Sequence, residues 1–562
     1  MMRLSGWGPC CLLGVAVCAQ TLLAQTQGVG CDASVVLKAG RSGPCTSLAQ
    51  AIAGLLEEPV VARDHWGIAV VGIDGAPIYA LNDGQLFQPA SNAKLFTTAA
   101  AMALLGAKAT YQTKVLAQGV FDDGGKLTGH LMLVGNGDAN LSGRVLPYVA
   151  PVPGERAAAE DSGFAPLRYL EEMADQVAAT GLKSVQGDVI GDDTVFPWEP
   201  YAQDWAIDDA VWGYGAPVSA LSVNDNQIKV TITPGDAVGA PASVVFDPAM
   251  TYYTLDVAVT TGAVKSGSTV QMERAPGSKV LRIYGAIGLH GQPDVEEIAI
   301  EDPAQYAALA LKGMLEARGV RVTGEARARH RVLMDTESFW KESGAIEDAA
   351  TKEGSPQQRI EPADDAAFGV AVTGEERTLA SHVSPALAED VVVTNKTSQN
   401  LHAELLLRQL GLARGRDGTI AQGARVVRQF LVSAGIDKDD FIFLDGSGLS
   451  GHDLVTPRAI ARLLQYASGQ TWFTGWKSSL PVGGVDGSLE GRFAKAPLKG
   501  KVFAKTGTLG EARALSGYVE CASGRTVIFS IMVGNHLPQT HADRDVMDKI
   551  VAAIAAAIAA EN

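Results

Sequence analysis

The character of this chain changes near residue 108, and the α/β pattern of its first part returns only near Leu379. Trp66–Asp74 (W-G-I-A-V-V-G-I-D) has the apolar run of a buried strand, and Ile78–Leu81 follows a Gly-Ala-Pro turn as its hairpin partner. After Leu379, strand and helix patterns continue to the C-terminus. Because one sheet can combine strands from distant parts of a chain, the sequence predicts an α/β domain interrupted by a long insertion.

The interrupting region, about residues 108–335, alternates short strands, Gly/Pro turns and two helical stretches. Within it, residues 226–300 are rich in strands, and the alternation in Gln227–Ile232 predicts half-buried antiparallel strands in a small sandwich. Asp302-Pro303 begins a predicted helix that Gly319 ends. The insertion is therefore expected to form one or two smaller, strand-rich domains.

The first residues have the pattern of an export signal. Arg3 is followed by the apolar run Cys10–Val17, which is too short to span a bilayer, and a cleavage site lies after Ala19 or near Ala24. A buried N-terminal helix is the alternative. We expect export to the periplasm or cell envelope, without a transmembrane anchor.

Charge and composition exclude several classes of function. The chain has 62 acidic and 46 basic side chains, a net charge of −16, and this surface should repel nucleic acid. The sequence contains neither a C-x-x-C pair nor an H-E-x-x-H motif, so we expect no metal site and no cofactor.

Ser91-Asn92-Ala93-Lys94 is an S-x-x-K motif at the start of an apolar helical pattern. Positions i and i+3 share a helix face, so the hydroxyl and the amine can touch, and a lysine of lowered pKa can activate the serine as a nucleophile. The alternative is an N-cap serine beside a solvated lysine. Ser338-Phe339-Trp340-Lys341 repeats the motif, but we assign it to a polar surface segment.

Ser398-Gln399-Asn400 is an S-x-N motif between the strand-like Val391–Thr394 and a predicted helix from Leu401 to Leu410. Ser398 can pass a proton between Lys94 and a leaving amine, while Asn400 orients the substrate amide and Lys94. Capping of the helix by Ser398 is the alternative. Ser222-Val223-Asn224 has the same spacing but lies inside the insertion, and we rank it lower.

Lys505-Thr506-Gly507-Thr508 continues the strand-like Val502–Ala504. An edge strand with this sequence can pair with an extended peptide. Lys505 offers a positive charge to a substrate carboxylate, Thr506 a hydroxyl, and Gly507 a close approach of the backbone. The N–H groups of Ser91 and Thr508 can then bind an oxyanion. An ordinary strand end with an exposed lysine is the alternative.

The order of the three motifs, S-x-x-K, S-x-N and K-T-G, is typical of penicillin-interacting serine enzymes. The chain resembles one family among them, the class C low-molecular-mass penicillin-binding proteins, which are D-alanyl-D-alanine carboxypeptidases/endopeptidases of peptidase family S13. The resemblance rests on blocks spread from about residue 45 to the C-terminus. Among them are F-Q-P-A-S-N-A-K-L-F around Ser91, V-G-N-G-D-A-N-L near Asp138, Y-G-A-P-V-S-A-L-S-V-N-D-N from Tyr214, D-G-S-G-L-S, L-P-V-G-G-V-D-G-S-L and F-A-K-T-G-T-L.

The resemblance implies an α/β (α+β) transpeptidase/β-lactamase-like domain with the long insertion described above. The expected organisation is a signal peptide at 1–24, the first part of the transpeptidase-like domain at 25–107, inserted domains at 108–335 with a nested domain at about 226–300, an acidic linker or insertion at 336–378, and the second part of the transpeptidase-like domain at 379–562.

The resemblance also implies an activity and its site. We expect cleavage of peptidoglycan stem peptides and cross-links through an acyl-enzyme on Ser91, with Lys94 as base and acylation by β-lactam antibiotics. Ser398, Asn400, Lys505 and Thr506 should line the site. Members of the family recognise a diaminopimelate amino group through an acidic residue of the insertion, for which Asp192, Asp193 and Asp204 are candidates; a structural role is the alternative for each.

Two other functions remain open at this stage. A serine β-lactamase or esterase would use the same chemistry, although no E-x-E-L-N-like stretch supplies a deacylating glutamate. A non-catalytic cell-wall-binding scaffold would keep the fold, although the complete motif set argues against it.

Overall fold

A computed structural model describes residues 45–150, 165–334, 337–345, 376–537 and 540–559, all within one compact unit that extends from Gly43 to Asn562. The predicted signal peptide and most of the predicted acidic linker lie outside these residues. Among the helices described, none combines the length and apolar character needed to cross a membrane.

A five-stranded antiparallel sheet combines strands from both ends of the chain, in the order β18-β19-β20-β1-β2. Its strands are β1 (His65–Gly72), β2 (Pro77–Leu81), β18 (Val502–Leu509), β19 (Ala512–Glu520) and β20 (Thr526–Gly534). The predicted strand at 66–74 and its hairpin partner are therefore both present.

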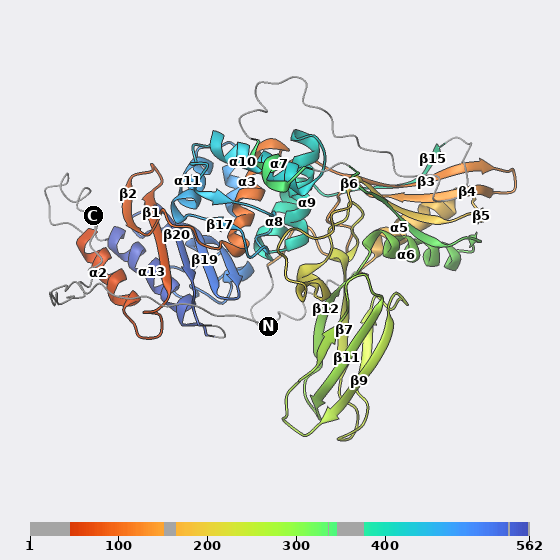
Figure 1. The fold of residues 1–562 in the computed structure, drawn as a ribbon, viewed down its shortest axis with the longest axis horizontal. Helices are drawn as coiled ribbons and strands as arrows, with labels where there is room; N and C mark the ends of the chain where they lie inside the picture. Colours follow the sequence, from red (N-terminus) through yellow and green to blue (C-terminus); the bar gives the residue numbers. More distant parts are fainter. Residues whose placement is uncertain (1–44, 151–164, 335–336, 346–375, 538–539, 560–562) are drawn as a thin grey trace, which may run out of the picture. The chain divides into compact units, whose positions relative to one another are not determined.

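Side chains of this sheet alternate between two cores, as the period of two in a strand requires. On one face of the sheet, Ile68 and Phe529 pack against helices α2 (Cys45–Leu56) and α13 (Ala542–Ala559) (Figure 1). On the other face, Ala69 and Met532 pack against a second set of helices. The second face is covered by α3 (Lys94–Leu104), α8 (Leu387–Lys396), α9 (Asn400–Arg414), α10 (Ile420–Ser433), α11 (Pro457–Ser468) and α12 (Phe473–Ser479).

The insertion leaves the chain after α3 and contains a seven-stranded sheet. Its strands are β3 (Gln112–Phe121), β4 (Lys126–Val134), β5 (Ser184–Gln186), β6 (Val189–Pro197), β13 (Arg321–Val322), β14 (Ala326–Arg331) and β15 (Glu376–Val383). Helices α5 (Arg168–Ala179) and α6 (Pro303–Ala317) pack on it. The side chain of Asp302 caps α6 by accepting from the backbone N–H of Gln305, as the Asp-Pro pair predicts.

Two three-stranded sheets within the insertion share one core with these elements. They are formed by β7 (Gln227–Thr233), β8 (Ser243–Asp247) and β12 (Asp294–Ala299), and by β9 (Thr254–Gly262), β10 (Gln271–Glu273) and β11 (Val280–Gly288). The expectation of antiparallel strands is wrong for one pair, because β9 and β11 run parallel. β10 returns the chain antiparallel, so β11 enters between β9 and β10 in the direction of β9.

Two segments differ from the sequence-based expectation. Val391–Thr394 lies in helix α8, not in a strand: Leu387, Val391 and Thr394 are buried at helical spacing, and this packing overrides the β propensity of the three valines. The strand β15, which crosses the expected domain boundary at residue 379, pairs with β3 of the insertion. The elements that cover the five-stranded sheet resume at α8.

Candidate active site

Ser91 lies in η1 (Ala90–Ala93), a tight 3₁₀ turn that leads directly into α3. In such a turn, side chains at i and i+3 eclipse one another, so the S-x-x-K spacing places Ser91 beside Lys94. The Nζ atom of Lys94 is 2.9 Å from the Oγ atom of Ser91. The residue before the serine, Ala90, has a left-handed backbone with φ of 46°.

Lys94 is fully buried and has two further partners. Its Nζ atom lies 2.6 Å from Oδ1 of Asn400 and 2.7 Å from the backbone oxygen of Ser447. Burial lowers the pKa of Lys94 to about 7, although the carboxyl groups of Asp445 and Glu404 act in the opposite direction. An amine with this pKa is partly neutral near pH 7 and can take a proton.

A buried carboxyl group supports the segment that contacts Lys94. Oε1 of Glu404 accepts hydrogen bonds from the backbone N–H groups of Gly446 (2.9 Å) and Ser447 (2.8 Å), which fixes the Ser447 carbonyl. Burial, with the charge of Asp445, raises the pKa of Glu404 to about 8. A mostly neutral Glu404 stabilises a charged Lys94 less than a carboxylate would.

The S-x-N segment joins α8 to α9. Ser398 has a left-handed backbone with φ of 62°, and its Oγ atom accepts a hydrogen bond from Nζ of Lys505 at 2.7 Å. Asn400 points to Lys94 through Oδ1, and its Nδ2 donates to the backbone oxygen of Tyr214 at 2.9 Å. The structure thus places Asn400 against Lys94, and Ser398 against the lysine of the K-T-G motif.

The K-T-G motif lies in β18, at the edge of the five-stranded sheet. Nδ2 of Asn92 donates to the backbone oxygen of Lys505 at 3.0 Å, which joins this strand to the Ser91 turn. A Cβ atom on Gly507 would lie 2.5 Å from the backbone oxygen of Pro89, so only glycine fits here without displacement. Thr508, the next residue, is exposed.

Lys505 lies close to a second buried amine. Burial, and then the charge of Lys94, hold the pKa of Lys505 well below its usual value. Its Nζ atom donates to Ser398 and, at 3.0 Å, to the backbone oxygen of Thr506. Two amines in one site favour occupation by an anion, because a bound carboxylate relieves their repulsion.

The structure adds contacts that the motif analysis missed. The Ser447 carbonyl and the Tyr214 carbonyl are backbone acceptors, so no residue type identifies them. Ser488 is exposed, and its Oγ atom is 2.7 Å from Oγ1 of Thr506. Ser447 and Ser488 belong to the blocks D-G-S-G-L-S and L-P-V-G-G-V-D-G-S-L, which carried the family resemblance but were given no site role.

The two repeated motifs have structural roles. Ser338 caps α7 (Phe339–Gly344) by accepting from the backbone N–H of Lys341, whose amine pairs with Glu337. Ser222 is buried and donates to the backbone oxygen of Ser219. Neither motif brings its serine to Lys94.

The acidic candidates for substrate recognition differ in exposure. Asp192 and Asp193 are buried and paired, the first with Arg329 at 3.2 Å and the second with His330 at 3.0 Å. Asp204 is partly exposed and pairs with His452 at 2.6 Å. Asp204 is therefore the most exposed of the three.

These observations place the residues of all three motifs around Ser91, and comparison with known proteins identifies the family. The model of the D-Ala-D-Ala carboxypeptidase 3 (S13) family matches residues 48–338 and 357–557. The chain belongs to the S13 peptidase family. The resemblance inferred from the sequence blocks is thereby confirmed.

Two similar proteins extend this result. The S13 peptidase is 32% identical over 516 residues to a D-alanyl-D-alanine carboxypeptidase from Actinomadura sp. (strain R39). The aligned region covers 90% of this chain and 84% of the relative. It is similar in structure to penicillin-binding protein 4 (DacB) from Haemophilus influenzae, with a TM-score of 0.70 and 20% identity over 92% of this chain and 99% of that one. The expected α/β fold with a long insertion is confirmed, and the chain is a serine-type carboxypeptidase.

Proposed function

We propose that this S13 peptidase is a D,D-carboxypeptidase and D,D-endopeptidase that cleaves D-Ala-containing peptidoglycan stem peptides and cross-links through an acyl-enzyme on Ser91. One observation carries the proposal: the buried amine of Lys94, with its pKa near 7, lies 2.9 Å from the Ser91 hydroxyl. That contact supplies a base for a hydroxyl that is otherwise a poor nucleophile.

The first step is acylation. Oγ of Ser91 attacks the carbonyl carbon of the penultimate D-Ala while its proton moves to Nζ of Lys94. The backbone N–H groups of Ser91 and Thr508 stabilise the oxyanion. The C–N bond then breaks as Ser398 relays the proton from Lys94 to the leaving amine, so the terminal D-Ala departs and Lys94 is neutral again.

Substrate binding follows from the edge position of β18. The peptide adds to this edge as a strand, with Asn400 oriented toward its amide. Lys505 and Thr506 bind the terminal carboxylate, and Gly507 leaves the strand close to Ser91. Water then attacks the acyl carbon, with Lys94 again as base, and releases Ser91.

β-Lactam antibiotics acylate the same serine, because their ring amide resembles the D-Ala-D-Ala unit. The structurally similar penicillin-binding protein 4 from Haemophilus influenzae has been solved in complex with a β-lactam, and this complex matches the chain with a TM-score of 0.65. We further propose that the protein is exported and acts in the periplasm or cell envelope, where its substrate lies.

The test is the intact mass of the protein after exposure to penicillin. The wild-type protein should gain one covalently bound penicillin, and Ser91→Ala should gain none. Release of D-Ala from a D-Ala-D-Ala peptide, measured in parallel, should be lost in the same variant. Rapid penicillin turnover without muropeptide cleavage would instead favour a β-lactamase, and absence of any adduct on the wild type would favour a non-catalytic scaffold.

A further inference from the structure

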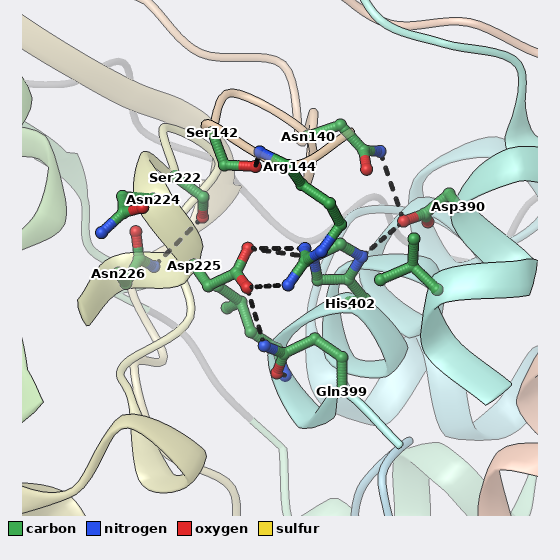
Figure 2. Close-up of polar contacts among 12 residues, drawn as sticks. Asn140, Ser142, Arg144, Ser222, Asn224, Asp225, Asn226, Asp390, Gln399 and His402 are labelled. Carbon is green, nitrogen blue, oxygen red and sulfur yellow. Dashed lines mark hydrogen bonds and ion pairs between the residues drawn. The ribbon is translucent and has the colours of Figure 1, made fainter. Parts of the chain in front are cut away.

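A largely buried group of charged and amide side chains joins the insertion to the S-x-N segment (Figure 2). We call it the Asp225 cluster. It consists of Asn140 and Arg144 from the segment after β4, Asp225 from the 3₁₀ turn η4 (Asn224–Asn226), Asp390 from α8, Gln399 from the S-x-N segment and His402 from α9. None of these residues takes part in the mechanism described above.

Asp225 is the centre of the cluster, and both its oxygen atoms are used. Oδ2 accepts from Nη2 of Arg144 at 2.6 Å and from Nε2 of Gln399 at 2.9 Å. Oδ1 lies 3.2 Å from Nη1 of Arg144 and 3.2 Å from Nε2 of His402. Although burial opposes ionisation, Arg144 and His402 hold the pKa of Asp225 well below its usual range.

His402 balances two carboxylates. Its side chain is fully buried. Nδ1 lies 2.6 Å from Oδ1 of Asp390, and Nε2 faces Asp225. Nε2 also lies 3.4 Å from Nη1 of Arg144. An acceptor at each ring nitrogen favours the doubly protonated, charged ring. Burial alone lowers the pKa of His402, but Asp390 and Asp225 outweigh it and raise the pKa to about 9.

The backbone around Asp225 is held in an uncommon conformation. Asn224, Asp225 and Asn226 have φ angles of 49°, 53° and 56°, a run of left-handed residues that requires support from its surroundings. The Asn226 side chain supplies it by donating to the backbone oxygen of Pro217 and accepting from the backbone N–H of Val223. This turn therefore directs the Asp225 carboxylate toward Arg144 and α9.

Gln399 transmits the position of Asp225 to the site. Its Oε1 accepts from the backbone N–H of Leu401 and caps α9, while its Nε2 donates to Asp225, so both ends of the amide are fixed. The next residue, Asn400, donates to the Tyr214 carbonyl, which leaves Oδ1 facing Lys94. The insertion thus anchors two successive residues of the S-x-N motif.

We propose that Asp225 is a positioning residue for catalysis, which acts through Gln399 to hold Ser398 and Asn400 in register with Lys94. Arg144 and His402 supply the positive charges that allow this carboxylate to be buried. The insertion is then part of the catalytic apparatus, although it contributes no side chain to the reacting atoms. The inference rests on the proposed acylation of Ser91.

Three variants separate positioning from folding. Gln399→Glu keeps an oxygen to cap α9 but removes the donor to Asp225 and sets two carboxylates side by side. Asp225→Asn removes the charge. In the double variant the new amide at position 225 can donate to the new carboxylate at position 399, which restores the link with its direction reversed.

The measurement is the acylation of each purified full-length protein by a penicillin, resolved into the rate constant at saturation and the apparent dissociation constant. A displacement of Asn400 by about 1 Å should slow acylation by about 100-fold in each single variant, with the dissociation constant changed by less than about threefold. The double variant should recover at least about tenfold of the lost rate, because the two sites are directly coupled.

Asp193→Asn is the matched control. Asp193 is also a buried carboxylate of the insertion beside a histidine, but its partners, His330 and Ser219, do not contact the S-x-N segment. This variant should lose thermal stability comparable to Asp225→Asn while its acylation rate stays within about twofold of the wild type.

Two results would overturn the inference. Folded Gln399→Glu and Asp225→Asn proteins that acylate at the wild-type rate would show that the cluster only supports folding. Equal slowing in Asp193→Asn, or no recovery in the double variant, would show that the effect is not transmitted through the 225–399 contact. Failure of the proposed function is distinguishable, because the wild-type protein itself would then form no adduct.

Discussion

The amine of Lys94 lies 2.9 Å from the Ser91 hydroxyl, and its two other neighbours, Oδ1 of Asn400 and the Ser447 carbonyl, can only accept hydrogen bonds. A neutral amine has two N–H donors and one lone pair. With its donors directed to Asn400 and Ser447, its lone pair faces the Ser91 proton. The surroundings of Lys94 therefore favour the orientation that its proposed role as a base requires.

The pH dependence of acylation should follow Lys94. Because the proposed mechanism uses the neutral amine, and its pKa is about 7, the second-order acylation rate should rise about tenfold per pH unit below pH 7 and level off above it. Stopped-flow acylation by a chromogenic β-lactam between pH 5.5 and 9 measures this profile. Circular dichroism at each pH checks folding, and a flat profile in folded protein would exclude Lys94 as the base.

Gly507→Ala should slow acylation, because it moves the K-T-G strand away from Ser91. The added methyl would lie 2.5 Å from the Pro89 backbone oxygen, so β18 must move away from the Ser91 turn. We expect a loss of about 100-fold in acylation rate and about 1–3 kcal/mol of stability. Gly510→Ala, which meets no atom within 4 Å, is the control and should behave as wild type.

Ser488 should contribute to recognition of the substrate carboxylate. Its hydroxyl lies 2.7 Å from that of Thr506 and can orient it toward the anion. Ser488→Ala should raise KM for a D-Ala-D-Ala peptide about threefold to tenfold, the value of one hydrogen bond, with kcat nearly unchanged. Steady-state kinetics on this peptide, with Ser488→Thr as the conservative variant, measures the effect. The same change in KM for a peptide amide, which lacks the carboxylate, would assign Ser488 to loop structure instead.

His402 should make folding stability depend on pH. Its folded pKa of about 9 exceeds its ordinary value of 6.5, so its contribution is complete below pH 6.5 and is lost as pH rises through 9. The loss should amount to roughly 3 kcal/mol. Denaturant unfolding at pH 6.5 and 9.5 measures it, and His402→Gln should show a smaller difference between the two pH values. An equal difference in both proteins would mean that other groups cause it.

The catalytic motifs could be located from the sequence because each one is local. The S-x-x-K spacing needs only one tight turn, and the K-T-G motif needs only an edge strand. Their meeting was predictable from their order, since strands near both ends of the chain suggested a shared sheet. The change of pattern near residue 108 and its return near residue 379 indicated that an insertion separates the two parts of this sheet.

Other features depend on contacts that no local pattern records. The Ser447 and Tyr214 carbonyls are available in any residue type, so their roles appear only in three dimensions. His402 lies on a helix that is buried on nearly every side. The hydrophobic periodicity of this helix therefore does not show which of its polar residues contact charged groups. Val391–Thr394 has the composition of a strand, but these residues form a helix because its buried side chains pack in the core at helical spacing.

The position of β1 between β2 and β20 has a consequence for the order of events during synthesis. The segment bearing Ser91 is made before β18, β19 and β20. Until they arrive, one edge of β1 is unpaired and the serine faces no K-T-G strand. By the proposed mechanism, hydrolytic competence therefore appears only after β18 has been made.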